Sequence, residues 1–119
     1  MIIRKATPCD FDRVWPFFSV IARAGETYAY PRDIDKAAAQ SEWMEKPRLT
    51  YVAESEGLIV GSYFLKTNHQ GPGEHVCNCG YMVAAEAQGK GVARALCEHS
   101  QKLARDLGYR AMQFNFVAS

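Results

Sequence analysis

The chain has 119 residues and a formal net charge of +1, with 48% hydrophobic and 23% charged residues. This length suffices for one domain and not for two, and the near-neutral charge gives no reason to expect nucleic acid or an anionic membrane as a partner. No apolar run approaches the roughly 20 residues that a membrane-spanning helix needs. Residues 1–5 also lack the apolar region of a signal peptide, so we expect one cytoplasmic domain over residues 1–119.

The chain begins with a predicted strand and helix. Residues 2–6 read as a short strand, after which Thr7 is expected to cap a helix whose first helical residue is Pro8. Apolar residues then recur every three or four positions, which is the period of one helix face. Pro16 lies inside this pattern and should kink the helix, and Gly25 should end it.

A polar and aromatic loop over 26–32 separates this helix from a second one, which should start at Asp33 and stop before Pro47. From residue 50 the apolar period changes to two, which is typical of strands. Three strands are expected over 51–55, 58–66 and 75–83. A Glu-Gly turn joins the first two of these strands as a hairpin.

The last part of the chain predicts a helix over 89–107, ended by Gly108, and a strand over 111–117. In that strand Met112, Phe114 and Phe116 fall on one face. The order is therefore strand, helix, helix, three strands, helix, strand. An antiparallel run followed by a crossover helix indicates an α+β (mixed α/β) fold with helices on both faces of the sheet.

Four cysteines are present, at Cys9, Cys77, Cys79 and Cys97. Their spacing fits neither a zinc site nor a redox pair of the C-x-x-C type, so no metal is expected. Because Cys77 and Cys79 are two residues apart on a strand, they share a face and are poor disulfide partners. We interpret all four as reduced thiols, and Cys77 and Cys79 as small buried hydrophobes rather than nucleophiles.

The most informative stretch is the run that joins the strand over 75–83 to the following helix, called here the glycine loop. Its residues are Gln88, Gly89, Lys90, Gly91, Val92 and Ala93. A strand that ends in a glycine turn at a helix N-terminus can bind an anion, because the first amides of the helix have no intrahelical partner and the helix dipole favours negative charge. The alternative is a capped helix start with two flexible glycines.

The glycine loop resembles the Q/R-x-x-G-x-G/A pyrophosphate loop of the GCN5-related N-acetyltransferases (GNAT), with Ala93 in place of the last glycine. The order of elements is also similar to that family's acyl-CoA N-acyltransferase fold, from its first strand to its fifth. The resemblance implies that acetyl-CoA binds with its pyrophosphate on residues 88–93. It also implies that the free end of the preceding strand binds the pantetheine arm, with a backbone amide of Met82 or Val83 on the thioester oxygen.

Family members continue with another helix and two strands, which this sequence lacks. We therefore expect either a fragment of a longer protein or a sheet that something else completes. The unpaired edge and apolar residues of the last strand lead us to expect a homodimer, with pairing or exchange of this strand between protomers.

Two shorter stretches, 75–81 and 114–117, resemble strand motifs of fungal enzymes that acetylate proline analogues such as azetidine-2-carboxylate. Those enzymes have an asparagine at the positions of Asn78 and Asn115, which are our candidate contacts for a small amine acceptor. The alternative is that both side chains only bond neighbouring backbone. The loop of Glu26 and Tyr28 covers the acceptor site in the family. Glu26 is thus a candidate base and Tyr28 a candidate acceptor contact, although a solvated carboxylate is the competing interpretation of Glu26.

These signals predict an acetyl-CoA-dependent N-acetyltransferase in which a small amine, an amino acid or a proline analogue, attacks the thioester directly. Asn78 and Glu26 are the candidate catalytic residues. Two alternatives stay open: a catalytically silent module that binds acyl-CoA, and a structural subunit. Glu86 is interpreted as a solvated charge near the helix start, and His99 as a histidine at the edge of the core.

Overall fold

The computed structural model describes residues 1–25, 30–67 and 76–116, with only the backbone described at 115 and 116. Glu26, Tyr28 and the predicted strand end at Val117 lie outside the described residues. The strands are β1 (Ile2–Lys5), β2 (Leu49–Ser55), β3 (Leu58–Thr67), β4 (Val76–Val83) and β5 (Ala111–Phe116). The helices are α1 (Phe11–Ala24), α2 (Lys36–Gln40) and α3 (Val92–Asp106), with 3₁₀ turns at Pro8–Asp10 and Ala85–Ala87 and a π-helical turn at Ser41–Glu45.

The five strands form one sheet in the order β1-β2-β3-β4-β5. The first three pairs are antiparallel, and β4 and β5 are parallel because α3 carries the chain back between them. The predicted order of elements and the mixed α+β class are therefore confirmed. β1 and β5 are the two edges of the sheet that the described residues form.

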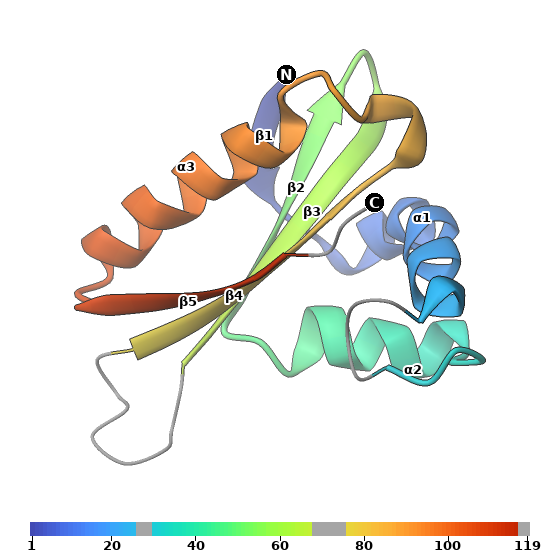
Figure 1. The fold of residues 1–119 in the computed structure, drawn as a ribbon, viewed down its shortest axis with the longest axis horizontal. Helices are drawn as coiled ribbons and strands as arrows, with labels where there is room; N and C mark the ends of the chain where they lie inside the picture. The colour runs from blue at the N-terminus through green and yellow to red at the C-terminus, as the bar shows by residue number, and fades with distance from the viewer. Residues whose placement is uncertain (26–29, 68–75, 117–119) are drawn as a thin grey trace.

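Helices cover both faces of this sheet (Figure 1), with α3 on one face and α1 and α2 on the other. On the α3 face, the Tyr81 hydroxyl lies 2.6 Å from Ser100 Oγ. On the opposite face, Trp43 donates a hydrogen bond to Ser62 Oγ (2.9 Å) and meets the Phe64 ring edge-on at 4.9 Å. Since alternate strand residues point to opposite faces, these contacts assign residues 61–67 of β3 and 76–82 of β4 to one helical layer each, whereas the register shift at Val60 interrupts the alternation before them.

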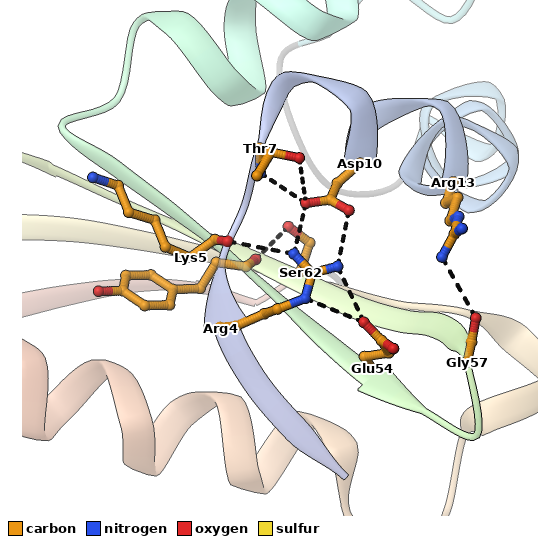
Figure 2. Close-up of polar contacts among 9 residues, drawn as sticks. Arg4, Lys5, Thr7, Asp10, Arg13, Glu54, Gly57 and Ser62 are labelled. Carbon is orange, nitrogen blue, oxygen red and sulfur yellow. Dashed lines mark hydrogen bonds and ion pairs between the residues drawn. The ribbon is translucent and has the colours of Figure 1, made fainter.

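The start of α1 is tied to the sheet by an ionic cluster (Figure 2). As predicted, Thr7 caps the first turn, and its N–H and hydroxyl donate to the Asp10 carboxylate at 2.7 and 3.0 Å. The Arg4 guanidinium of β1 donates two further bonds to Asp10, at 2.8 and 2.9 Å, and also reaches Glu54 of β2. These bonds from Arg4 hold the pKa of the Asp10 carboxyl well below its usual range.

Two predicted helix starts are wrong. The second helix begins at Lys36 and not at Asp33, because Asp35 is the residue whose side chain caps it, accepting from the Ala38 N–H at 2.7 Å. The third helix begins at Val92 and not at Gly89, because Gly89 and Gly91 have left-handed φ angles of 77° and 80° that a helix does not allow.

Candidate functional site

The chain leaves β4 at Val83, passes through the 3₁₀ turn at Ala85–Ala87, and then enters the glycine loop, whose last two residues are the first of α3. Gly89 and Gly91 both have left-handed φ angles, which glycine adopts without the steric cost that a Cβ imposes. A Cβ built on either residue would meet no atom within 4 Å. The two glycines therefore set the backbone path, and the space beside them is open to a ligand.

The N-terminus of α3 presents amides next to this loop that precede the hydrogen bonds of the helix. The first hydrogen bond of the helix runs from the Ala95 N–H to the Gly91 carbonyl at 3.0 Å, so the amides of Val92 and Ala93 precede the helical ladder. Gly91 is the N-cap and has no side chain with which to satisfy them. The positive end of the helix dipole and the exposed Lys90 add to the attraction for an anion.

The position of these amides is fixed by packing below the loop. Val92 is 5% exposed, and a Cβ on Gly61 of β3 would lie only 2.9 Å from Val92 Cγ1. Val92 therefore fits closely over a glycine in the sheet, and its side chain is an anchor rather than a ligand contact. Among the predicted cofactor residues, Val92 would act through its backbone, whereas Gln88, Lys90 and Ala93 are exposed.

The register of β4 against β3 decides which of the two predicted thioester amides faces β3. The Ala84 N–H donates to the Val60 carbonyl oxygen at 2.9 Å. Two residues before Ala84 in the chain, Met82 pairs with Ser62 of β3. Successive amides of a strand point to opposite sides, so the Met82 N–H points to β3 and the Val83 N–H points away from it. On that side the pairing with β5 is described as far as Tyr81 and Phe116, two residues before Val83.

Asn78 and Asn115 lie on one face of the sheet. In the parallel register Asn78 is level with Gln113, and Asn115 is level with Gly80, so the two asparagines stand in neighbouring rows. This is the α1 and α2 face, because Gly80 pairs with Phe64. Asn78 is half-buried, and the exposed Lys66 is its neighbour across the β3–β4 ladder. The side chain of Asn115 lies outside the described residues, as do Glu26 and Tyr28.

A groove of about 600 Å³ runs beside the glycine loop, between α1 and the strand ends. We call it the α1 groove. Its walls come from α1, the β2–β3 turn, the start of β3 and the segment after β4, and they include Phe17, Ile21, Ile59, Val83 and Gln88. Val83 and Gln88 are therefore common to the groove and to the predicted cofactor site. Sequence patterns gave no sign of this groove, although Val20, which lines it, falls outside the buried stripe of α1.

The remaining chemically active side chains are explained by packing. Cys77 and Cys79 are fully buried, and burial raises the pKa of Cys79 to about 12 and also raises that of Cys77. Both thiols are therefore protonated near neutral pH, which confirms their interpretation as small buried hydrophobes. His99 is half-buried with its Nδ1 2.7 Å from the Tyr63 hydroxyl, at the edge of the core as predicted. Glu86 is exposed and lines the α1 groove.

Across residues 1–25, 30–67 and 76–116, no three acidic, histidine or cysteine side chains gather in a way that could hold a metal ion. No helix in the same part of the chain is both long and apolar enough to cross a membrane.

Comparison with known proteins identifies the family. The model of the acetyltransferase (GNAT) family matches residues 12–119. A GCN5-related N-acetyltransferase from Kribbella flavida is 42% identical, with a TM-score of 0.86 over 96% of this chain and 70% of that one. The structure of yncA from Salmonella typhimurium, solved with its cofactor acetyl-CoA, is 20% identical and shares the fold, with a TM-score of 0.80 over 94% of this chain and 67% of that one.

Among curated proteins, the N-acetyltransferase aca1 of Schizosaccharomyces pombe is 26% identical over 106 residues. The match covers 89% of this chain and 44% of aca1, so the chain spans less than half the length of that relative. The family model and the Kribbella structure each match most of the chain, and the glycine loop lies inside the range that the family model matches. The chain belongs to the acetyltransferase (GNAT) family.

Proposed function

We propose that this protein is an acetyl-CoA-dependent N-acetyltransferase acting on a small amine, such as an amino acid or a proline analogue. The observation that carries the proposal is the segment after β4, where left-handed glycines at 89 and 91 lead into the N-terminal amides of α3 at Val92 and Ala93, which precede its hydrogen-bonded ladder. Membership of the GNAT family and the similarity to aca1 support it.

The residues of the glycine loop fit the pyrophosphate of acetyl-CoA. The pyrophosphate is an anion, and the loop offers it amides, a helix N-terminus, an exposed lysine and open space beside both glycines. Bound acetyl-CoA would supply the activated acetyl group. The Val83 amide, which points away from β3, is the donor that we place on the thioester oxygen, where it would stabilise the negative charge that develops during attack.

We assign binding of the acceptor amine to residues of β4 and β5. Asn78 and Asn115 would orient the amine by hydrogen bonding, with Tyr28 as a further contact. Glu26 would take the amine proton, directly or through a water molecule. The nitrogen then forms the new C–N bond as the C–S bond breaks, and the departing thiolate of coenzyme A takes up the equivalent of the proton lost by the amine and leaves as the thiol. No covalent enzyme intermediate is needed.

The cofactor assignment is tested by Gly91→Glu. A glutamate there adds negative charge and puts a side chain at a left-handed position, so binding of acetyl-CoA should fall below detection in calorimetry. Gly108→Glu is the matched control, because Gly108 also has a left-handed φ (89°) with open space around its Cβ position, at the far end of the same helix. Loss of affinity in both variants, or in neither, would contradict the assignment.

The acceptor assignment is tested by Asn78→Ala and Asn115→Ala. Each should raise KM for the amine or lower kcat while leaving the acetyl-CoA dissociation constant nearly unchanged. Normal turnover with a reduced melting temperature would show instead that the asparagines only bond the backbone. Tight acetyl-CoA binding without turnover on any amine would favour the alternative of a silent acyl-CoA-binding module.

We also propose a cytoplasmic homodimer formed through the outer edge of β5. In the described sheet β5 is an edge strand, and Phe114 on it is 40% exposed, although its ring stacks on Tyr81 at 6.2 Å. An edge strand beside apolar surface favours pairing with a second chain. Sedimentation of the 119-residue chain tests this, and a monodisperse monomer at high micromolar concentration would refute it.

A further inference from the structure

The α1 groove shares two of its walls with the proposed cofactor site. Val83 carries the amide assigned to the thioester, and Gln88 opens the glycine loop, and both line the groove. A cavity of about 600 Å³ is therefore lined by the residue whose amide we place on the thioester oxygen. We propose, on the basis of the function proposed above, that the groove binds the aliphatic chain of acyl-CoA thioesters longer than acetyl.

The chemistry of the groove fits an uncharged chain. Its interior is lined by buried apolar side chains, with Phe17 and Ile21 at 8% exposure and Ile59 at 7%. The two charged residues that border it, Arg13 and Glu86, are exposed, and Arg13 Nη1 lies 3.5 Å from the Gly57 carbonyl (Figure 2). An acceptor amine is a cation near neutral pH and would lose hydration in such an interior without gaining a partner.

The rim of the groove is also apolar. Val20 on α1 and Leu58 at the start of β3 are 62% and 66% exposed. Large exposed apolar side chains gathered around a cavity are typical of a binding site, and an acyl chain in the groove would cover them. The volume falls within the range of about 300–1,000 Å³ typical of small-molecule pockets.

A longer acyl group needs no new chemistry. The amine nitrogen attacks the same carbonyl, the C–N bond forms as the C–S bond breaks, and coenzyme A leaves as the thiol after the amine proton is transferred. Only the substituent on the carbonyl changes. The groove would thus widen the range of donors from acetyl-CoA to medium-chain acyl-CoA.

Calorimetry with acetyl-CoA and octanoyl-CoA tests the proposal without any acceptor. Each buried methylene is worth a factor of about 4 in affinity, so burial of half of the six added methylenes would tighten binding about 60-fold. We expect octanoyl-CoA to bind at least about 10-fold more tightly than acetyl-CoA. Equal affinities would overturn the inference and leave the proposed function standing, whereas failure of both ligands to bind would overturn the two together.

Substitutions at the rim of the α1 groove test whether the acyl chain binds there. Val20→Asp and Leu58→Asp put a carboxylate beside the groove at side chains that are 62% and 66% exposed, and should remove the preference for octanoyl-CoA while keeping the affinity for acetyl-CoA. Ile2→Asp is the matched control, because Ile2 is 64% exposed on β1, outside the groove. An octanoyl preference that survives both rim substitutions would overturn the inference. A dimer that Leu58→Asp converts to a monomer would also overturn it, because a second copy would then cover the groove.

Discussion

The ionic cluster at the start of α1 gives the most quantitative prediction for stability. Asp10 is 7% exposed and accepts two hydrogen bonds from Arg4 and two from Thr7, so it joins β1, the cap and α1 at one point. Asp10→Ala removes the acceptor and leaves Arg4 with Glu54 and water, since the Arg4 side chain is 36% exposed.

The cost can be worked out from these contacts. Loss of a helix cap costs about 1 kcal/mol. Removal of the buried, ionised acceptor costs about 1–2 kcal/mol more, at the lower end of the range for charged hydrogen bonds because Arg4 stays partly hydrated. For 119 residues the unfolding entropy near the melting point is about 250 cal/mol/K, so a loss of 2–3 kcal/mol lowers Tm by about 8–12 °C.

The same cluster also predicts the direction in which the free energy of unfolding changes with pH. Arg4 lowers the pKa of Asp10 in the folded state, so the unfolded chain binds a proton there first. The stabilisation by Asp10 is therefore complete well above its unfolded pKa of about 3.9, and it is lost as the pH falls from there toward the folded pKa. The difference in unfolding free energy between wild type and Asp10→Ala should shrink below about pH 4.

Urea unfolding of both proteins at several pH values measures this difference. Asp12→Ala is the control: Asp12 is on the same helix and pairs with Lys36, but its side chain is 71% exposed, so the change should stay within about 0.5 kcal/mol. An Asp10→Ala effect no larger than that of Asp12→Ala, or one that is independent of pH down to pH 3, would refute the reasoning.

Two further predictions concern the packing of α3. Gly61→Ala places a Cβ 2.9 Å from Val92 Cγ1 and should destabilise the protein by about 1–3 kcal/mol in thermal unfolding, and an unchanged Tm would show that the contact relaxes freely. Burial, with a smaller effect of Lys102, lowers the pKa of His99, so stability should fall as the pH drops below about 6.5. His99→Gln should remove that slope between pH 7.5 and 5.5 in urea unfolding, and an identical slope in the variant would exclude His99 as its source.

The sequence by itself predicted the elements whose signals are local. Gly89 and Gly91 marked the turn at the start of α3, Thr7 and Pro8 marked the start of the first helix, and the period-two runs marked β2, β3 and β4. Each of these depends on the conformational preference of a few neighbouring residues, so no distant contact is needed to recognise it. The exact helix starts were missed where two residues, such as Asp33 and Asp35, offer equivalent caps.

The tertiary structure decided what the candidate site contains. That Asn78 and Asn115 share a face follows from the parallel register of β4 and β5, which α3 separates in sequence. That the Val83 amide points away from β3 while the Met82 amide points to it follows from pairing with β3, and the α1 groove exists only because α1 lies beside the strand ends. Strand register and the packing of helices on the sheet are set by contacts between residues far apart in the chain. A pattern of neighbouring residues therefore does not predict them.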